Sequence, residues 1–414
     1  MSDRPAPRAD VPAGTAAGPT VPARPITPTH AAGYGPAGPT GGPNGTSTTT
    51  VGLGHNGTTS RSGSRSGYAD AGPIETDQIR RHRTPGPAQG TAGPDDVAAV
   101  AARITANIAK VIEGKPEVIR LGLTVLLAEG HLLIEDVPGV GKTKFAKALA
   151  RSIDCSVRRI QFTPDLLPSD VTGVSIYSAE RRDFEFKPGA VFANIVVGDE
   201  INRASPKTQS ALLESMEERQ VTVDTTTYEL ETPFMVLATQ NPIDMEGTYP
   251  LPEAQLDRFT ARMSIGYPDR SAEMAMLAEH GALDPLDDLT PVSDANEIRA
   301  MIGAVRNVYV ADAVKAYAVD LANATRSMPE IRLGASPRAV LQLIRTAKAW
   351  AAIEHRDYVA PDDVQRLVRP VLAHRLILTP EAQLGRRTAE SLLDTIVSRT
   401  PVPVSAVPTA AHHR

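Results

Sequence analysis

The stretch that decides the fold reads His131-Leu132-Leu133-Ile134-Glu135-Asp136-Val137-Pro138-Gly139-Val140-Gly141-Lys142-Thr143. An apolar strand leads into a glycine-rich turn, and residues of high helix propensity follow from Lys144 to Arg151. Glycine lets the backbone adopt positive φ and approach a ligand closely, so the amides of the turn can surround a phosphate at the N-terminus of the next helix. The pattern therefore predicts a strand, a phosphate-binding loop and a helix.

The loop residues are predicted to bind a nucleotide together. Lys142 would reach the β- and γ-phosphates, and the Thr143 hydroxyl would take one Mg²⁺ position. Asp136 stands where this motif usually begins with glycine, but that position lies outside the amides that surround the phosphate. The predicted nucleotide-binding residues are Pro138, Gly139, Val140, Gly141, Lys142, Thr143 and Lys144.

The composition of residues 1–94 differs from that of the rest of the chain. This segment holds 14 of the 35 prolines and 17 of the 31 glycines, and its hydrophobic residues stand singly. Because no buried core can offset the entropy of ordering it, we expect a disordered arm. Eight arginines against five acidic residues give the arm a charge of +3, so the remaining residues carry −8 to give the chain's formal −5. This balance does not support nucleic-acid binding.

The apolar runs and the cysteine content of the sequence indicate the cellular compartment of the protein. No run of about 18 apolar residues occurs, and the N-terminus lacks the apolar region of a signal peptide. Cys155 is the single cysteine, which excludes an internal disulfide and fits a reducing compartment. We therefore expect a cytoplasmic protein without a membrane span.

Residues 95–270 are predicted to form an α/β domain around a parallel sheet. Asp95 and Asp96 form an N-cap pair ahead of the first helical pattern. Continuously apolar runs separated by helical segments are typical of a parallel sheet covered on both faces. After the first strand, these runs occur at 157–162, 195–197, 234–238 and 262–265. Alternating patterns predict two β-hairpins inserted into this core, at 174–187 and 220–231.

Residues 271–398 show helical periodicity only, which predicts a second, all-helical domain. Its helices are expected at 296–308, 311–326, 337–352 and 361–369. Residues 399–414 have no periodicity and are predicted to form a flexible tail.

Polar residues follow two of the predicted strands. Asp199 can hold Mg²⁺, and Glu200 can accept a proton from a water that attacks the γ-phosphate. Asn241 precedes Pro242, which forces a turn, and its amide would orient the same water. Taken alone, such residues are also found in solvated turns, so the assignment depends on the phosphate loop upstream.

Two arginines complete the predicted site. Arg258 lies at the end of the α/β domain, after Leu256 and Asp257. Arg338 projects from a helix start in the second domain, where Ser336 is the expected N-cap. The planar, permanently charged guanidinium suits the oxygens of a phosphoryl group in its transition state.

The order of these motifs resembles the MoxR family of AAA+ ATPases over about residues 95–398. The matching segments are Asp136–Thr143, Asp199–Ala204, Thr239–Pro242, Glu253–Phe259 and Gly334–Arg338. The resemblance implies that Asn241 is the first sensor, Arg258 an arginine finger given to a neighbouring subunit, and Arg338 the second sensor. It also implies that 271–398 is a helical lid, and that the hairpins are the helix-2 and pre-sensor insertions. Gly114-Lys115 stands where the family often has Gly-Gln beside the adenine.

The resemblance further implies a function. It predicts a Mg²⁺-dependent ATPase that assembles as a homo-oligomer, a hexameric ring, and remodels or matures a client protein complex, including by insertion of a metal cofactor. Lys142 and Mg²⁺ would stabilise the γ-phosphate. A partner protein with a von Willebrand A-type domain is also implied, and this chain lacks the Asp-x-Ser-x-Ser motif of such a domain.

Three alternatives stay open from the sequence. A magnesium-chelatase-like motor subunit belongs to the same clade, and a companion chelatase subunit would favour it. A nucleotide-gated scaffold would bind ATP without hydrolysing it, and the presence of Glu200, Asn241 and Arg258 argues against this. A DNA-acting motor would need a basic surface, whereas the folded part is acidic.

Overall fold

The computed structural model describes residues 93–137, 139–241, 248–268, 270, 273–274 and 285–403. The predicted arm therefore lies outside the described residues except for its last two positions. Pro138, Pro242 and residues 404–414 of the predicted tail also lie outside them.

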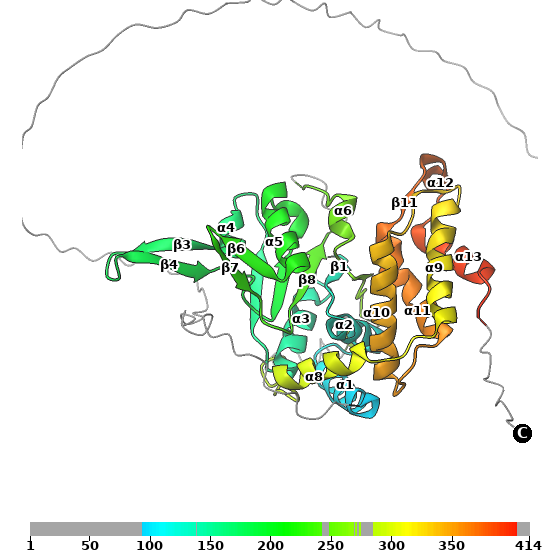
Figure 1. The fold of residues 1–414 in the computed structure, drawn as a ribbon, viewed down its shortest axis with the longest axis horizontal. Coiled ribbons are helices and arrows are strands. Elements are labelled where there is room, and N and C mark those ends of the chain that lie inside the picture. Colours follow the sequence, from blue (N-terminus) through cyan, green and yellow to red (C-terminus); the bar gives the residue numbers. More distant parts are fainter. Residues whose placement is uncertain are drawn as a thin grey trace, which may run out of the picture. The chain divides into compact units, whose positions relative to one another are not determined.

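The centre of the α/β part is a five-stranded parallel sheet with the order β2-β5-β8-β1-β9 (Figure 1). Its strands are β1 (Leu132–Glu135), β2 (Val157–Gln161), β5 (Ile195–Asp199), β8 (Met235–Gln240) and β9 (Ala261–Met263). In this order β8 lies between β5 and β1. Leu237 of β8 is aligned with Leu132 of β1 on one side and with Val197 of β5 on the other. The carboxyl ends of β1, β5 and β8 consequently meet at one edge of the sheet, where open α/β folds bind their ligands.

Helices cover both faces of this sheet, as the sequence predicts. Leu132 and Ile134 of β1 belong to one hydrophobic cluster, and Leu133 between them belongs to another, because side chains alternate along a strand. The first cluster includes residues of α1 (Pro94–Ala109), α2 (Pro116–Leu127) and α3 (Lys142–Ser152), and the second includes residues of α5 (Pro206–Glu218). The short helices of this part are α4 (Pro168–Thr172), η1 (Ile201–Arg203) and α6 (Glu253–Leu256).

Both predicted hairpins are present and antiparallel. The first consists of β3 (Gly173–Ser178) and β4 (Asp183–Pro188), the second of β6 (Gln220–Val223) and β7 (Thr226–Glu229). Figure 1 shows β3 and β4 projecting from the part that contains the sheet. The hairpins touch through Phe186 and Tyr228, whose rings stack with centroids 4.1 Å apart.

The C-terminal part consists of helices and one small sheet. In the continuously described segment from residue 285 onwards, the helices are α8 (Ala295–Arg306), α9 (Asp312–Ser327), α10 (Pro337–Ile353), α11 (Pro361–Leu372), η2 (Ala373–Arg375), α12 (Pro380–Leu384) and α13 (Ala389–Arg399). The sequence prediction of helices only was incomplete, because β10 (Ile331–Leu333) pairs with β11 (Ile377–Leu378). Two or three residues are too few to show a strand period. Among the described residues, no helix combines the length and the hydrophobicity needed to cross a membrane.

Two local predictions need correction. The first helix begins at Pro94, and its N-cap is Gly93 rather than the Asp95-Asp96 pair. Asp96 instead accepts a hydrogen bond from the Gly93 amide at 2.9 Å, as the returning side chain of the cap. Helix α11 continues through Pro370 to Leu372, because a proline in the last turn removes only one hydrogen bond of the helix.

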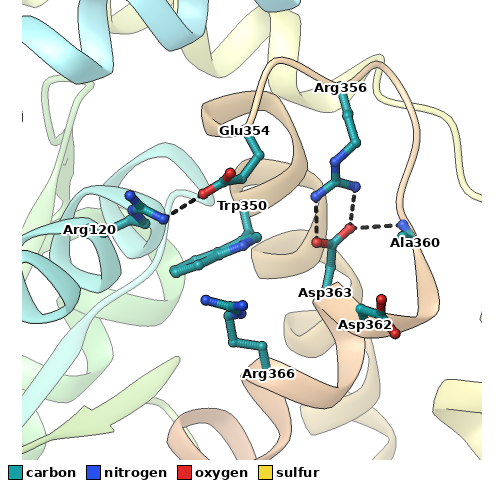
Figure 2. A pocket seen from close by; sticks show the side chains of 8 residues that line it. All are labelled: Arg120, Trp350, Glu354, Arg356, Ala360, Asp362, Asp363 and Arg366. Atoms are coloured by element: carbon teal, nitrogen blue, oxygen red, sulfur yellow. Dashed lines mark hydrogen bonds and ion pairs between the residues drawn. The ribbon is translucent and has the colours of Figure 1, made fainter.

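The lid helices pack against α2 around Trp350, the single tryptophan of the sequence (Figure 2). Its ring is 4% exposed and lies between two guanidinium groups. The central carbon of Arg120 is 5.4 Å from the ring centroid, and that of Arg366 is 5.2 Å from it. Arg120 of α2 also pairs with Glu354, just after α10, at 2.5 Å. These contacts join α2, α10 and α11 through one buried aromatic ring.

Candidate functional site

The phosphate loop runs from the end of β1 to the start of α3. Gly139 has φ of 88° and Gly141 has φ of 94°, both in the left-handed region. A Cβ atom on Gly139 would meet nothing within 4 Å, so the backbone conformation, and not a lack of space, requires glycine there. Gly141 is the N-cap of α3, and Lys142, Thr143 and Lys144 form the first turn of that helix. Such a turn directs backbone amides towards an anion at the helix start.

Asp136, which departs from the usual glycine of this motif, anchors the loop. Its Oδ2 accepts hydrogen bonds from Ser264 Oγ at 2.9 Å, Ile265 N at 2.8 Å and Gly266 N at 2.7 Å. Its Oδ1 accepts one from Val137 N at 2.9 Å. Burial alone would raise the pKa of this carboxyl, but the four hydrogen bonds hold it below its usual range. The ionised side chain therefore ties the loop to the segment that follows β9.

Lys142 lies close to the carboxylates of the site. Its Nζ donates a hydrogen bond to the Asp136 carbonyl oxygen at 2.7 Å. Burial lowers the pKa of the ammonium group, and the negative charges of Asp136, Asp199 and Glu200 oppose that effect. The structure thus brings the predicted phosphate-binding lysine and both predicted carboxylates to one place.

Thr143 and Asp199 lie in the geometry that a shared Mg²⁺ ion needs. Thr143 Oγ1 donates to Asp199 Oδ2 at 3.1 Å, and Thr239 Oγ1 donates to Asp199 Oδ1 at 3.3 Å. Two Mg²⁺ ligands at about 2.1 Å in neighbouring octahedral positions lie about 3.0 Å apart. The Thr143 hydroxyl and the Asp199 carboxylate therefore have the spacing of adjacent magnesium ligands, and Asp199 Oδ2 would exchange its contacts with Thr143 and with Arg159 Nε at 2.6 Å for the ion.

Glu200 has an unusual backbone conformation at the end of β5. Its φ of 59° and ψ of 50° place it in the left-handed region, which a residue with a Cβ atom rarely adopts. Its amide donates to Thr239 Oγ1 of β8 at 3.0 Å. Its Oε2 accepts from Gln161 Nε2 at 3.1 Å and lies 3.1 Å from Arg203 Nε. Backbone outliers of this kind cluster at functional sites.

Sequence reasoning missed the contribution of β2 to this site. Arg159 Nε contacts Asp199 Oδ2 at 2.6 Å, and Arg159 Nη2 donates to Gln161 Oε1 at 2.8 Å. The run 157–162 was predicted to be a continuously apolar strand, but β2 is an edge strand with exposed polar residues. The two-residue spacing of Arg159 and Gln161 was the available signal, since such residues share one face of a strand.

Asn241 directly follows β8, at the sheet edge where β1 and β5 also end. Its side chain is 7% exposed. The residue is therefore near the predicted carboxylates in the topology, while Pro242, on which its predicted turn depends, lies outside the described residues.

The two predicted arginines come together on a shared glutamate, Glu217. Arg258 Nε lies 3.1 Å from Glu217 Oε2, and Arg338 Nη1 donates to Glu217 Oε1 at 2.7 Å. Within the described part of the chain, neither arginine pairs with Asp199 or Glu200. The site of this single chain thus holds the lysine, the hydroxyl and the carboxylates, but it does not include the arginines.

A cavity of about 330 Å³ lies between α2, α10 and α11, beside Trp350. Figure 2 shows its charged lining, in which Arg356 and Asp363 form a two-bond ion pair at 2.6 Å. None of the phosphate-loop residues lines it. Its three arginines are balanced by three acids, so we assign no ligand to it.

Two segments of the chain match known protein families. Residues 131–261 match the ATPase family associated with various cellular activities (AAA), and residues 323–396 match the AAA lid domain. The first match contains Lys142, Thr143, Asp199, Glu200 and Asn241, and also Arg258. The second contains Arg338.

Whole-chain comparisons agree with these matches. The chain is 49% identical over 310 residues to the uncharacterized protein YeaC of Bacillus subtilis, which covers 75% of this chain and 97% of that protein. It is 38% identical over 316 residues to the chaperone MoxR1 of Mycobacterium tuberculosis, which covers 74% of this chain and 83% of that protein. A crystal structure from Cytophaga hutchinsonii, described as a candidate ATPase, superposes with a TM-score of 0.70 at 36% identity and covers 75% of this chain and 98% of that one.

Proposed function

Because this chain belongs to the MoxR family of AAA+ ATPases, we propose that it hydrolyses ATP at the edge of its sheet and uses the reaction to remodel a protein partner. The observation that carries the proposal is the 3.1 Å contact between Thr143 Oγ1 and Asp199 Oδ2. It joins the phosphate loop to the carboxylate strand at the spacing of two adjacent Mg²⁺ ligands.

The phosphate loop binds the nucleotide in this proposal. The residues from Pro138 to Lys144 supply it, and the backbone amides after Gly139 surround the β-phosphate. Lys142 exchanges its hydrogen bond to the Asp136 carbonyl for the phosphate oxygens. Thr143 and Asp199 would hold Mg²⁺, which would supply positive charge to those oxygens.

Glu200 acts as the general base for the attacking water, and Asn241 orients that water. Gln161 and Arg203 both contact Oε2 of Glu200, so we assign Oε1 to the water. The two contacts fix the carboxylate in direction, which a general base within hydrogen-bond reach of its water requires. Thr239 supports the same arrangement, because it bonds both the Glu200 amide and Asp199 Oδ1.

Hydrolysis between subunits completes the proposal. Arg258 and Arg338 pair with Glu217, and within the described residues neither pairs with Asp199 or Glu200 of its own chain. A guanidinium that stabilises the phosphoryl transition state is often supplied by a second molecule. We therefore assign Arg258 to the ATP of a neighbouring subunit, in a homo-oligomeric ring that the family resemblance indicates is a hexamer.

The partner in this proposal is a protein. The β3–β4 hairpin exposes Tyr177 at 55% and Phe184 at 69%, and their rings are in edge contact at 5.5 Å. Exposed aromatic side chains on a projecting element are common at protein–protein contacts. The family resemblance suggests a partner with a von Willebrand A-type domain and a client complex that is matured, including by insertion of a metal cofactor.

Two substitutions test the site directly. Lys142→Ala removes a charged phosphate contact and should weaken ATP binding about ten- to a hundredfold. Glu200→Gln keeps the phosphate contacts but removes the base, so it should bind ATP normally and hydrolyse it about a hundredfold or more slowly. Calorimetry measures the binding, and single-turnover phosphate release measures the hydrolysis.

Lys147→Ala, on the exposed side of the same helix, is the matched control and should change neither quantity. Hydrolysis by Glu200→Gln at the wild-type rate would show that Glu200 is not the base. Wild-type protein that binds ATP and releases no phosphate would favour a nucleotide-gated scaffold instead.

A further inference from the structure

Glu217, near the end of α5, lies between two arginines from distant parts of the chain. Arg338 Nη1 donates to Oε1 at 2.7 Å, and Arg258 Nε lies 3.1 Å from Oε2. The side chains of Glu217, Arg258 and Arg338 are 39%, 27% and 34% exposed, so all three are reachable from the surface. Each oxygen of the Glu217 carboxylate contacts the guanidinium of a different arginine.

This bridge leaves both arginines able to bind a phosphate. A guanidinium has five N–H donors on three nitrogens. Arg258 reaches Oε2 through Nε and Arg338 reaches Oε1 through Nη1, and two carboxylate oxygens cannot occupy all the donors of two guanidinium groups. The two guanidinium groups carry the same charge and repel each other, and the Glu217 carboxylate between them offsets that repulsion. The remaining net charge of the three groups is positive, which favours an anion.

A second carboxylate connects the backbone segments that carry the arginines. Ser336 Oγ donates to Asp257 Oδ1 at 3.0 Å and to Oδ2 at 3.1 Å. The buried Arg375 places its Nε 3.2 Å from Asp257 Oδ1 and also donates to the Phe259 carbonyl. Asp257 precedes Arg258, and Ser336 caps the helix on which Arg338 stands. The segment that carries Arg258 and the start of α10, which carries Arg338, are thus joined by contacts that do not involve Glu217.

We propose that Glu217 is a positioning residue that presents Arg258 and Arg338 as one pair to a single ATP. The proposal rests on the ATPase function proposed above. Glu217 does not touch the nucleotide. It fixes the direction of both side chains, so the ATP that receives Arg258 also receives Arg338.

The test replaces Glu217 by glutamine, which has nearly the same shape but no charge. Loss of one charged hydrogen-bond acceptor should lower kcat by about tenfold. The KM for ATP and the oligomeric state should stay unchanged, because the phosphate loop is intact. Glu218→Gln, the neighbouring exposed glutamate on the same helix, is the control and should keep the wild-type kcat.

The Glu217→Gln substitution is then made in the Arg258→Ala and in the Arg338→Ala protein, and the rate constant of phosphate release is measured in single turnovers. The fold loss caused by Glu217→Gln should be clearly smaller in each arginine variant than in the wild-type protein, because only one arginine is left to position. The same fold loss in both backgrounds, or a Glu217→Gln protein with unchanged or raised kcat, would overturn the positioning role. Wild-type protein that binds ATP and never releases phosphate would overturn the proposed ATPase function itself.

Discussion

His131, immediately before β1, has a hydrogen-bond partner on each ring nitrogen. Nε2 lies 3.0 Å from the Met216 carbonyl oxygen, and Nδ1 accepts from Val236 N at 3.0 Å. Because a backbone N–H can only donate, Nδ1 carries no proton and the ring is neutral. Burial lowers the pKa of this histidine from 6.5 to about 4, despite the contact with Met216. The neutral ring joins the helix that carries Glu217 to the central sheet.

The stability of the protein should fall in acid for this reason. The folded state holds the pKa of His131 below its ordinary value, so the contribution of the neutral ring to the free energy of unfolding is complete above about pH 6.5. This contribution is lost as the pH falls towards 4, and the loss amounts to about 3 kcal/mol. Denaturant unfolding at a series of pH values measures it. His131→Gln should show a smaller fall over the same range, and an equal fall would assign the effect to other groups such as the buried His374, whose pKa is also lowered by burial.

At the scale of single residues, the sequence predicts the chemistry of contiguous motifs and misses contacts that only the fold creates. Lys142, Thr143 and Asp199 belong to recognisable patterns, and the structure brings them together. Glu217 belongs to no pattern: it is one glutamate on an amphipathic helix, and its partner Arg338 is 121 residues away. The catalytic roles given to Glu200, Asn241, Arg258 and Arg338 stay predictions.

At the scale of elements, long periodic segments are predicted well and short ones are not. The parallel strands were predicted from apolar runs, both hairpins from alternating patterns, and α8, α9, α10 and α11 from helical periods, whereas α13 was not predicted individually. The pair β10–β11 was missed because its strands are too short to have a period. The run at 157–162 was interpreted wrongly as continuously apolar, although Arg158, Arg159 and Gln161 are visible in the sequence; these polar residues fit the edge position of β2.

Helix α10 depends on Ser336 more than a capping pattern alone indicates. Ser336 Oγ accepts from Ala339 N at 3.1 Å and also donates to Asp257. Ser336→Ala should therefore lower the free energy of unfolding by about 1 to 3 kcal/mol, more than loss of a cap alone. Denaturant unfolding measures this. Ser327→Ala, an exposed serine at the end of α9, is the control, and equal stability of the two variants would contradict the account.

At the scale of the whole molecule, the residues to which we assign catalysis form two separate sets of contacts. The lysine, hydroxyl and carboxylates lie at the edge of the sheet, and the two arginines lie on Glu217. We infer that a single chain in this arrangement has an incomplete site, because the transition state of phosphoryl transfer needs positive charge near its oxygens. In our proposal, the site becomes complete when a neighbouring subunit supplies its arginines. Assembly and hydrolysis should therefore depend on each other.

Mixing two inactive variants tests this claim most directly. Lys142→Ala has intact arginines and a defective phosphate loop, and Arg258→Ala has the reverse. In mixed assemblies, one type of interface combines an intact loop with an intact Arg258. Phosphate release should then rise above the level of either variant alone, with a maximum near equal proportions. Mixtures that co-assemble, as shown by co-purification of differently tagged subunits, and still release no more phosphate than their parents would contradict the shared site.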